Sequence, residues 1–225
     1  MTDPVTVGTA VVAYIEPHPG QARAFNAWYE RDHFYASAMA GPGMYAGARW
    51  VATKACKAAR PSGDLLGDPA RGSYLATYWL LPGTQAVWDE WAAREYASLP
   101  PERRFSGRDH LHTAVYRYAW DFRAEGAPAP PIALDHGYAG VVAAAWSEPE
   151  AGRRWAATVV GADVPLVIGL EPERTIMSET DPAVHTLALA FCATNPLTVP
   201  LPAGAGFASP FLRTIPGTDT YTDDL

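Results

Sequence analysis

Residues 25–33 read Phe-Asn-Ala-Trp-Tyr-Glu-Arg-Asp-His, at the centre of a stretch, 21–39, that contains neither Gly nor Pro. Helix-forming residues dominate this stretch and Gly41-Pro42-Gly43 ends it, so we expect a helix over residues 21–39. The Val-rich run from Val5 to Ile15 predicts a buried strand before the helix, and Tyr45 to Thr53 predicts a second strand after it. This strand–helix–strand unit is the start of the fold.

The chain that follows completes a four-stranded pattern. Residues 57–72 are rich in Pro and Gly and predict a loop. Tyr74 to Leu81 predicts a third strand, Thr84 to Ser98 a second helix with Thr84 as its N-cap, and His110 to Phe122 a fourth strand. The order strand, helix, strand, strand, helix, strand is the ferredoxin-like arrangement.

A Pro/Ala-rich linker, residues 123–137, separates this first half from a shorter second half. The expected elements there are strands at Tyr138–Trp146, Pro165–Ile176, His185–Ala193 and Phe211–Ile215, and one short helix at Pro149–Val159. The sequence therefore predicts a ferredoxin-like half over residues 1–122 and a reduced ferredoxin-like half with an irregular tail over residues 138–225.

Two such halves predict a closed barrel. Each sheet has helices on one face and leaves the other face apolar, so pairing the apolar faces buries both and removes the exposed edges. We expect an α+β fold in which the two tandem halves form an eight-stranded antiparallel barrel of the dimeric α/β-barrel type around a cavity.

Composition excludes several classes of function. The 225 residues include 17 Lys and Arg against 24 Asp and Glu, a net charge of −7, which argues against a nucleic-acid or anionic-membrane partner. No apolar run approaches the length of a membrane span and the N-terminus has no basic leader, which predicts a cytoplasmic protein. Cys56 and Cys192 are far apart and predict two reduced thiols. The 8 Trp and 11 Tyr residues predict either a ligand pocket or an aromatic core.

The first predicted helix has a candidate acid–base group. At α-helical spacing Asn26, Tyr29 and His33 share a narrow arc beside an aromatic stripe that includes Trp28. An imidazole titrates near neutral pH, and a phenol or amide beside it can orient a substrate carbonyl. The alternative is that Trp28 is ordinary core and that His33 bonds a carbonyl near the helix end.

The run Asn26-x-Trp28-Tyr29-x-x-x-His33, followed by a Pro-Gly turn and Ala48-Arg49, resembles the EthD-like group of the dimeric α/β-barrel superfamily. That superfamily includes lactone isomerases, polyketide cyclases, cofactor-free monooxygenases and haem-dependent enzymes. The resemblance implies a functional His33 with Asn26, Trp28 and Tyr29 around it. The second half has no matching motif, so the resemblance implies an asymmetric site.

The fourth predicted strand is the second candidate. Strict alternation places one set of side chains on a single face, which we expect to line the barrel: His110, His112, Tyr116, Tyr118 and Trp120. Arg49 and Tyr78 from neighbouring strands could join this lining. The alternatives are a solvent-facing polar side or histidines bonded to backbone within the core.

These candidates predict a small-molecule enzyme with cofactor-independent proton transfer, of isomerase, cyclase or lyase type, acting on an apolar carbonyl compound. His33, His110 and His112 are the expected acid–base groups with Tyr29, and no metal site is expected. Two alternatives stay open: a non-catalytic ligand-binding or assembly module, and a haem enzyme with His110, His112 or His185 as axial ligand. A homodimer is possible.

Overall fold

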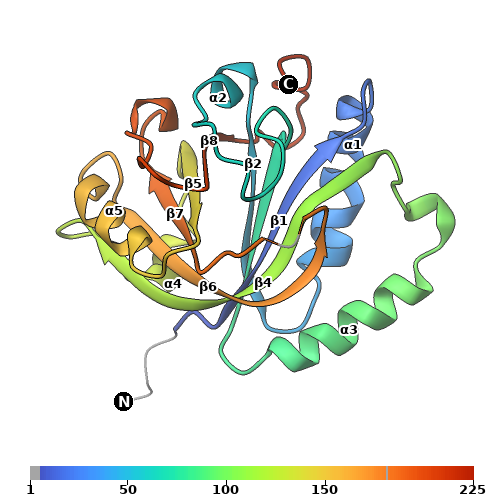
Figure 1. Cartoon of the computed structure of the whole chain (residues 1–225). Coiled ribbons are helices and arrows are strands. Elements are labelled where there is room, and N and C mark those ends of the chain that lie inside the picture. The colour runs from blue at the N-terminus through green and yellow to red at the C-terminus, as the bar shows by residue number, and fades with distance from the viewer. Residues whose placement is uncertain (1–5, 181) are drawn as a thin grey trace.

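The computed structural model describes residues 6–180 and 182–225; Val5, the first residue of the predicted first strand, lies outside them. The strands are β1 (Thr9–Pro17), β2 (Met44–Val51), β3 (Tyr74–Leu80), β4 (Arg108–Arg123), β5 (Gly140–Trp146), β6 (Leu166–Ser178), β7 (Thr186–Cys192) and β8 (Phe207–Arg213). They form one closed antiparallel barrel in the order β1-β3-β2-β8-β5-β7-β6-β4 (Figure 1). The predicted α+β barrel is confirmed, and it closes within a single chain.

Helices lie on the outside of the barrel. They are α1 (Ala22–Trp28) continued by η1 (Tyr29–Ala38), α2 (Lys54–Ala58), α3 (Gln85–Ser98), η2 (Pro101–Arg103), α4 (Pro130–Ala133), α5 (Ala151–Val159) and η3 (Pro196–Thr198). Figure 1 shows α1 and α3 on one side of the barrel and α5 on the other. In the described ranges, no helix has the length and apolar character needed to cross a membrane.

Several element boundaries differ from the prediction. α2 lies between two expected elements and was not predicted; its N-cap Thr53 accepts a hydrogen bond from the Cys56 N–H. The last strand begins at Phe207, four residues earlier than expected, because barrel closure pairs it with β5 despite Pro210. Thr84 occupies the N-cap of α3, but its hydroxyl donates to the Leu81 carbonyl rather than capping the helix.

The barrel has two seams where strands of the two predicted halves meet. The order within the first four strands is β4-β1-β3-β2, and within the last four it is β8-β5-β7-β6. At one seam β4 and β6 pair through eleven residue pairs. At the other, β2 and β8 pair only at Trp50–Arg213 and Val51–Leu212. The division into units of residues 1–122 and 138–225 stays a prediction.

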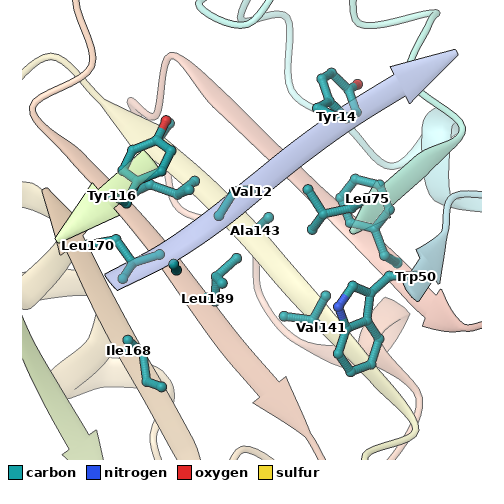
Figure 2. Close-up of a cluster of buried hydrophobic side chains, with 14 of the residues drawn as sticks. Val12, Tyr14, Trp50, Leu75, Tyr116, Val141, Ala143, Ile168, Leu170 and Leu189 are labelled. Carbon is teal, nitrogen blue, oxygen red and sulfur yellow. The ribbon is translucent and has the colours of Figure 1, made fainter. Parts of the chain in front are cut away.

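The barrel interior is filled with side chains. Figure 2 shows Val12, Leu75, Val141, Leu170 and Leu189 pointing into the same space from different strands. Larger rings complete this core and are nearly or fully buried: Tyr14, Trp50, Trp79, Tyr116, Phe191 and Phe211. An eight-stranded barrel is just wide enough for side chains to fill. The interior is therefore a packed core and not the cavity that we expected within the barrel.

Candidate functional site

The helix carrying residues 25–33 changes character in the middle of the motif. α1 ends at Trp28 and the chain continues from Tyr29 as a π-helix, with wider turns closed by i→i+5 hydrogen bonds such as Met39 N–H to the Phe34 carbonyl, 2.8 Å. The prediction of one α-helix over residues 21–39 is therefore wrong after Trp28. π-Helical turns are rare and often occur at functional sites.

Arg49 lies at the centre of the layer between this helix and the sheet. The residue is 6% exposed, and its guanidinium carbon is 4.3 Å from the centroid of the Tyr29 ring. Its Nη1 donates to Asn26 Oδ1 at 3.1 Å and to Glu30 Oε1 at 3.2 Å. Its Nη2 is buried and has no hydrogen-bond partner among the described residues. A buried donor without an acceptor costs about 1–3 kcal/mol, so Nη2 would gain by donating a hydrogen bond to a ligand oxygen placed beside it.

Tyr29 connects Arg49 to a second phenol. The Tyr29 and Tyr78 hydroxyls are 2.7 Å apart and both side chains are buried. Burial raises the pKa of Tyr29, and it raises the pKa of Tyr78 well above its ordinary value. Both phenols therefore stay protonated at neutral pH and serve as neutral hydrogen-bonding groups.

An open cleft lies beside Arg49 where β2 and β8 separate. We call it the seam cleft, and it is open to solvent. Its lining comes from η1, β2, the end of β8 and the chain after it: Glu30, Phe34, Tyr35, Gly47, Ala48, Arg49, Arg213, Thr214 and Pro216. The cleft thus combines the Glu30–Arg49 ion pair, a second arginine and an apolar wall, which suits a small amphipathic ligand.

The C-terminal tail holds the polar groups of this site in place. The Gly217 N–H donates to Glu30 Oε2 at 2.8 Å, while Asn26 Nδ2 donates to the Thr218 carbonyl at 2.9 Å. Both the Thr214 N–H and its hydroxyl donate to the Arg49 carbonyl, each at 3.1 Å. Figure 1 shows this C-terminal segment beside β2 and α1. The tail is therefore part of the site.

His33 is not among the residues that line the seam cleft. Its ring stacks on Trp28 at 4.7 Å between centroids and meets the edge of Tyr29 at 4.8 Å. Burial, with a smaller contribution from the Arg108 guanidinium, lowers the pKa of His33 to about 3. The imidazole is neutral at pH 7 and is a weak base there.

The structure contradicts the prediction that His110 and His112 share one face. A β-bulge between Tyr14 and Ile15 sets these two residues opposite His112 and His110, with Leu111 as the extra residue. The bulge turns His110 toward the helices, where its Nδ1 lies 2.8 Å from Thr113 Oγ1 and its Nε2 accepts from Arg108 at 3.2 Å. Burial and Arg108 lower the pKa of His110 to about 4.

His112 stays in the barrel interior with Tyr116. Its Nε2 is 2.7 Å from the Tyr116 hydroxyl and its Nδ1 is 3.5 Å from Ser178 Oγ. The Ser178 hydroxyl donates to the Leu111 carbonyl, so Nδ1 of His112 carries the proton and Tyr116 donates to Nε2. Burial lowers the pKa of His112 to about 4. The pair satisfies itself, which is typical of core packing.

The other two members of the predicted strand face also separate. Tyr118 packs against the interior core and bonds Asp121, whereas Trp120 lies on the outside under α5, with the Arg153 guanidinium 5.2 Å from its ring. A register shift between Tyr118 and Trp120 breaks the alternation that the prediction assumed. The predicted site residues thus lie in three places. The helix–sheet layer brings together Asn26, Trp28, Tyr29, His33, Arg49, Tyr78 and His110.

The three histidines expected as axial ligands do not fit a haem site at the seam cleft. Both ring nitrogens of His110 and of His112 already have partners, and His185 is exposed before β7. None of the three presents a free nitrogen to the seam cleft. In the described ranges there is also no group of three or more His, Cys, Asp or Glu side chains that could hold a metal ion.

Sequence reasoning missed Glu30 and Arg213. Glu30 had a usable signal, because it follows Asn26 by four residues on the same helix and so projects toward the same strand as Asn26. Arg213 had none: it reaches the cleft only because barrel closure pairs it with Trp50.

Comparison with known proteins shows the fold and nothing finer. No protein-family model and no curated protein matches the sequence. A crystal structure of an anthrone oxidase-like protein is similar, with a TM-score of 0.60 and 9% identity over 94% of this chain and 95% of that one. A proposed monooxygenase of Fusobacterium nucleatum subsp. nucleatum gives a TM-score of 0.49 with 9% identity over 94% of each chain. The first likeness supports the dimeric α/β-barrel fold; the EthD-like resemblance stays a prediction.

Proposed function

We propose that the protein is a small-molecule enzyme that moves a proton on a carbonyl compound without a cofactor, and that the reaction takes place in the seam cleft. The observation that carries this proposal is the Glu30–Arg49 pair. A carboxylate and a guanidinium lie 3.2 Å apart in the lining of a cleft, and the buried guanidinium retains a donor with no partner among the described residues.

The two groups have complementary roles. Arg49 Nη2 donates to the carbonyl oxygen of the substrate and stabilises the negative charge that develops there. Glu30 takes a proton from the carbon activated by that carbonyl, giving an enolate, and returns it to another carbon. Isomerisation, cyclisation and elimination all begin with the removal of the proton that gives the enolate. The proton is conserved, and no oxidant is consumed.

Tyr29 and Tyr78 support the electrophilic side of the site. The Tyr29 ring lies against the Arg49 guanidinium, and the Tyr29–Tyr78 hydrogen bond fixes that ring under the helix. The His33 ring also contacts Tyr29, in a T-shaped arrangement. Its role as a second acid–base group, expected from the motif, stays a prediction; a pH–rate profile of His33→Ala that matches the wild type would remove it from the mechanism.

Exchange of carbon-bound protons with solvent tests the proposal without knowledge of the natural substrate. We expect the protein to accelerate deuterium uptake into the methylene groups of anthrone or 2-tetralone in anaerobic D₂O, as followed by NMR. Glu30→Gln keeps the shape of the side chain and should slow the exchange by about 100-fold or more. The matched control is Glu171→Gln on the barrel surface, which should exchange at the wild-type rate.

The possible outcomes separate the alternatives. Wild-type exchange no faster than buffer, or full activity in Glu30→Gln, would contradict the proposal. Binding of the ketones without exchange would favour the ligand-binding module. Oxygen consumption when air is admitted would extend the chemistry to oxidation of the same enolate by O₂, the class of reaction named for the anthrone oxidase-like structure.

A further inference from the structure

Arg213 is a cation that lines the seam cleft and has no acidic partner in the part of the chain that the structure describes. It is the last residue of β8, and its guanidinium carbon lies 5.7 Å from the centroid of the Trp50 ring. Its Nη1 donates to the His136 carbonyl at 3.3 Å. None of the ion pairs formed within residues 6–180 and 182–225 involves Arg213. Its remaining N–H groups are therefore available to a ligand.

The charges that line the cleft do not cancel. Arg49 and Arg213 contribute two positive charges and Glu30 one negative charge, which leaves an excess of one positive charge in a protein whose net charge is −7. Each oxygen of Glu30 accepts one hydrogen bond, Oε1 from Arg49 and Oε2 from the Gly217 N–H, and keeps a second lone pair for the proton transfer. Glu30 is thus held toward Arg49 and the tail. The uncompensated charge belongs to Arg213, and it favours an anionic group.

The remaining wall of the cleft is apolar. Phe34, Tyr35 and Pro216 line it, and Tyr35 is 60% exposed although its ring is a large apolar surface. Exposed aromatic rings beside a charged group are typical of sites that hold an aromatic ligand body and anchor its polar end.

The weak strand pairing explains why the cleft is open at this seam. β2 pairs with β8 only at Trp50 and Val51, so Gly47 and Ala48 have no partner strand on this side and line the cleft instead. The Met39 side chain, which follows η1, also packs close to Gly47. A Cβ at position 47 would lie 2.5 Å from Met39 Sδ. The opening therefore follows from the limited pairing of β2 with β8.

We propose that the substrate is an aromatic acid whose carboxylate pairs with Arg213. The ring lies against Phe34 and Tyr35, and the reacting carbonyl faces Arg49 and Glu30. This inference rests on the proposed function, since it identifies the class of substrate for the same cleft. Arg213 is then the residue that selects acids over neutral aromatic ketones and amides of the same size.

Calorimetric titration of the full chain with 2-naphthoate and 2-naphthamide tests the inference. The two probes share a ring system and differ in charge. We expect the wild type to bind 2-naphthoate about tenfold or more tightly than 2-naphthamide. Arg213→Gln should remove that preference while changing the affinity for 2-naphthamide by less than about twofold, and Arg213→Lys should retain part of the preference. Arg117→Gln, which removes an exposed arginine from β4, is the matched control and should behave as the wild type.

Equal affinity for the two probes, a preference that survives in Arg213→Gln, or no binding of either probe at millimolar concentration would overturn the inference. The titration measures binding without turnover. A protein that prefers 2-naphthoate through Arg213 but exchanges no protons would therefore refute only the proposed function. A protein that exchanges protons but shows no preference would refute only the aromatic acid.

Discussion

The inner and outer faces of the barrel wall differ in how their polar groups are satisfied. Inside the barrel, His112 bonds to Tyr116 through Nε2 and to the Ser178 hydroxyl through Nδ1. Apolar side chains fill the surrounding space. Outside, Arg49 lies beside an open cleft, and its Nη2 has no hydrogen-bond partner within residues 6–180 and 182–225. A satisfied polar pair in a filled core stabilises a fold. A ligand oxygen would satisfy the buried donor beside the cleft, so we place the proton transfer on the outer face, while Arg213 reaches the seam from the side of Trp50.

Removing Arg49 should produce the largest effect. In Arg49→Met the Glu30 carboxylate, whose side chain is 13% exposed, loses its cation and Asn26 loses a donor. We expect the free energy of unfolding in urea to fall by about 3–5 kcal/mol, with proton exchange lost as well. Arg49→Lys keeps the charge but not the planar fork, and should lose activity with a smaller loss of stability. Wild-type stability in Arg49→Met would show that the layer is not organised around this residue.

Acid should destabilise the protein through imidazoles on both faces. The folded pKa values of His33, His110 and His112 are lowered to about 3, 4 and 4, below the ordinary value of 6.5. The unfolded chain therefore binds more protons than the native state below pH 6.5. Stability should be level above that pH and fall as the pH drops toward 4, by at most about 1.4 kcal/mol per pH unit for each imidazole.

Urea unfolding at a series of pH values measures this slope. His112→Asn removes one of the three groups from the interior, so its slope between pH 6 and 4.5 should be about one third smaller than that of the wild type. A slope that does not change would mean that His112 titrates normally and is not enclosed by the barrel.

Removing the interior hydroxyl should have the smallest effect. Tyr116→Phe deletes the donor to His112 Nε2 and leaves the ring in place. We expect a loss of about 1–2 kcal/mol in the free energy of unfolding, with proton exchange and 2-naphthoate binding unchanged. A large loss of exchange in this variant, measured on folded protein, would move the chemistry into the barrel.

Most of the fold was predictable because it depends on local patterns. The Gly- and Pro-free stretch at residues 21–39 and the apolar runs around it identified strands and a helix, and their order identified the sheet. The final strand begins four residues before the predicted Phe211, because pairing with β5 accommodates Pro210 within it.

The site was predictable only in part. The motif residues Asn26, Tyr29 and Arg49 do meet, because one helix packs on one strand. The histidines of β4 were assigned to one face because alternation was assumed, and a bulge opposite Tyr14 and Ile15 reverses the direction of His110. A bulge depends on the pairing of two strands far apart in sequence, so periodicity within one strand does not reveal it.

The most direct test of the central claim compares one variant from each face in the same reaction. Deuterium exchange into anthrone should be about 100-fold or more slower in Glu30→Gln and within about twofold of the wild-type rate in His112→Asn, with both proteins shown to be folded by circular dichroism. That result would place the proton transfer on the outer face of the barrel. Loss of exchange in His112→Asn with full exchange in Glu30→Gln would contradict the account and place the chemistry inside.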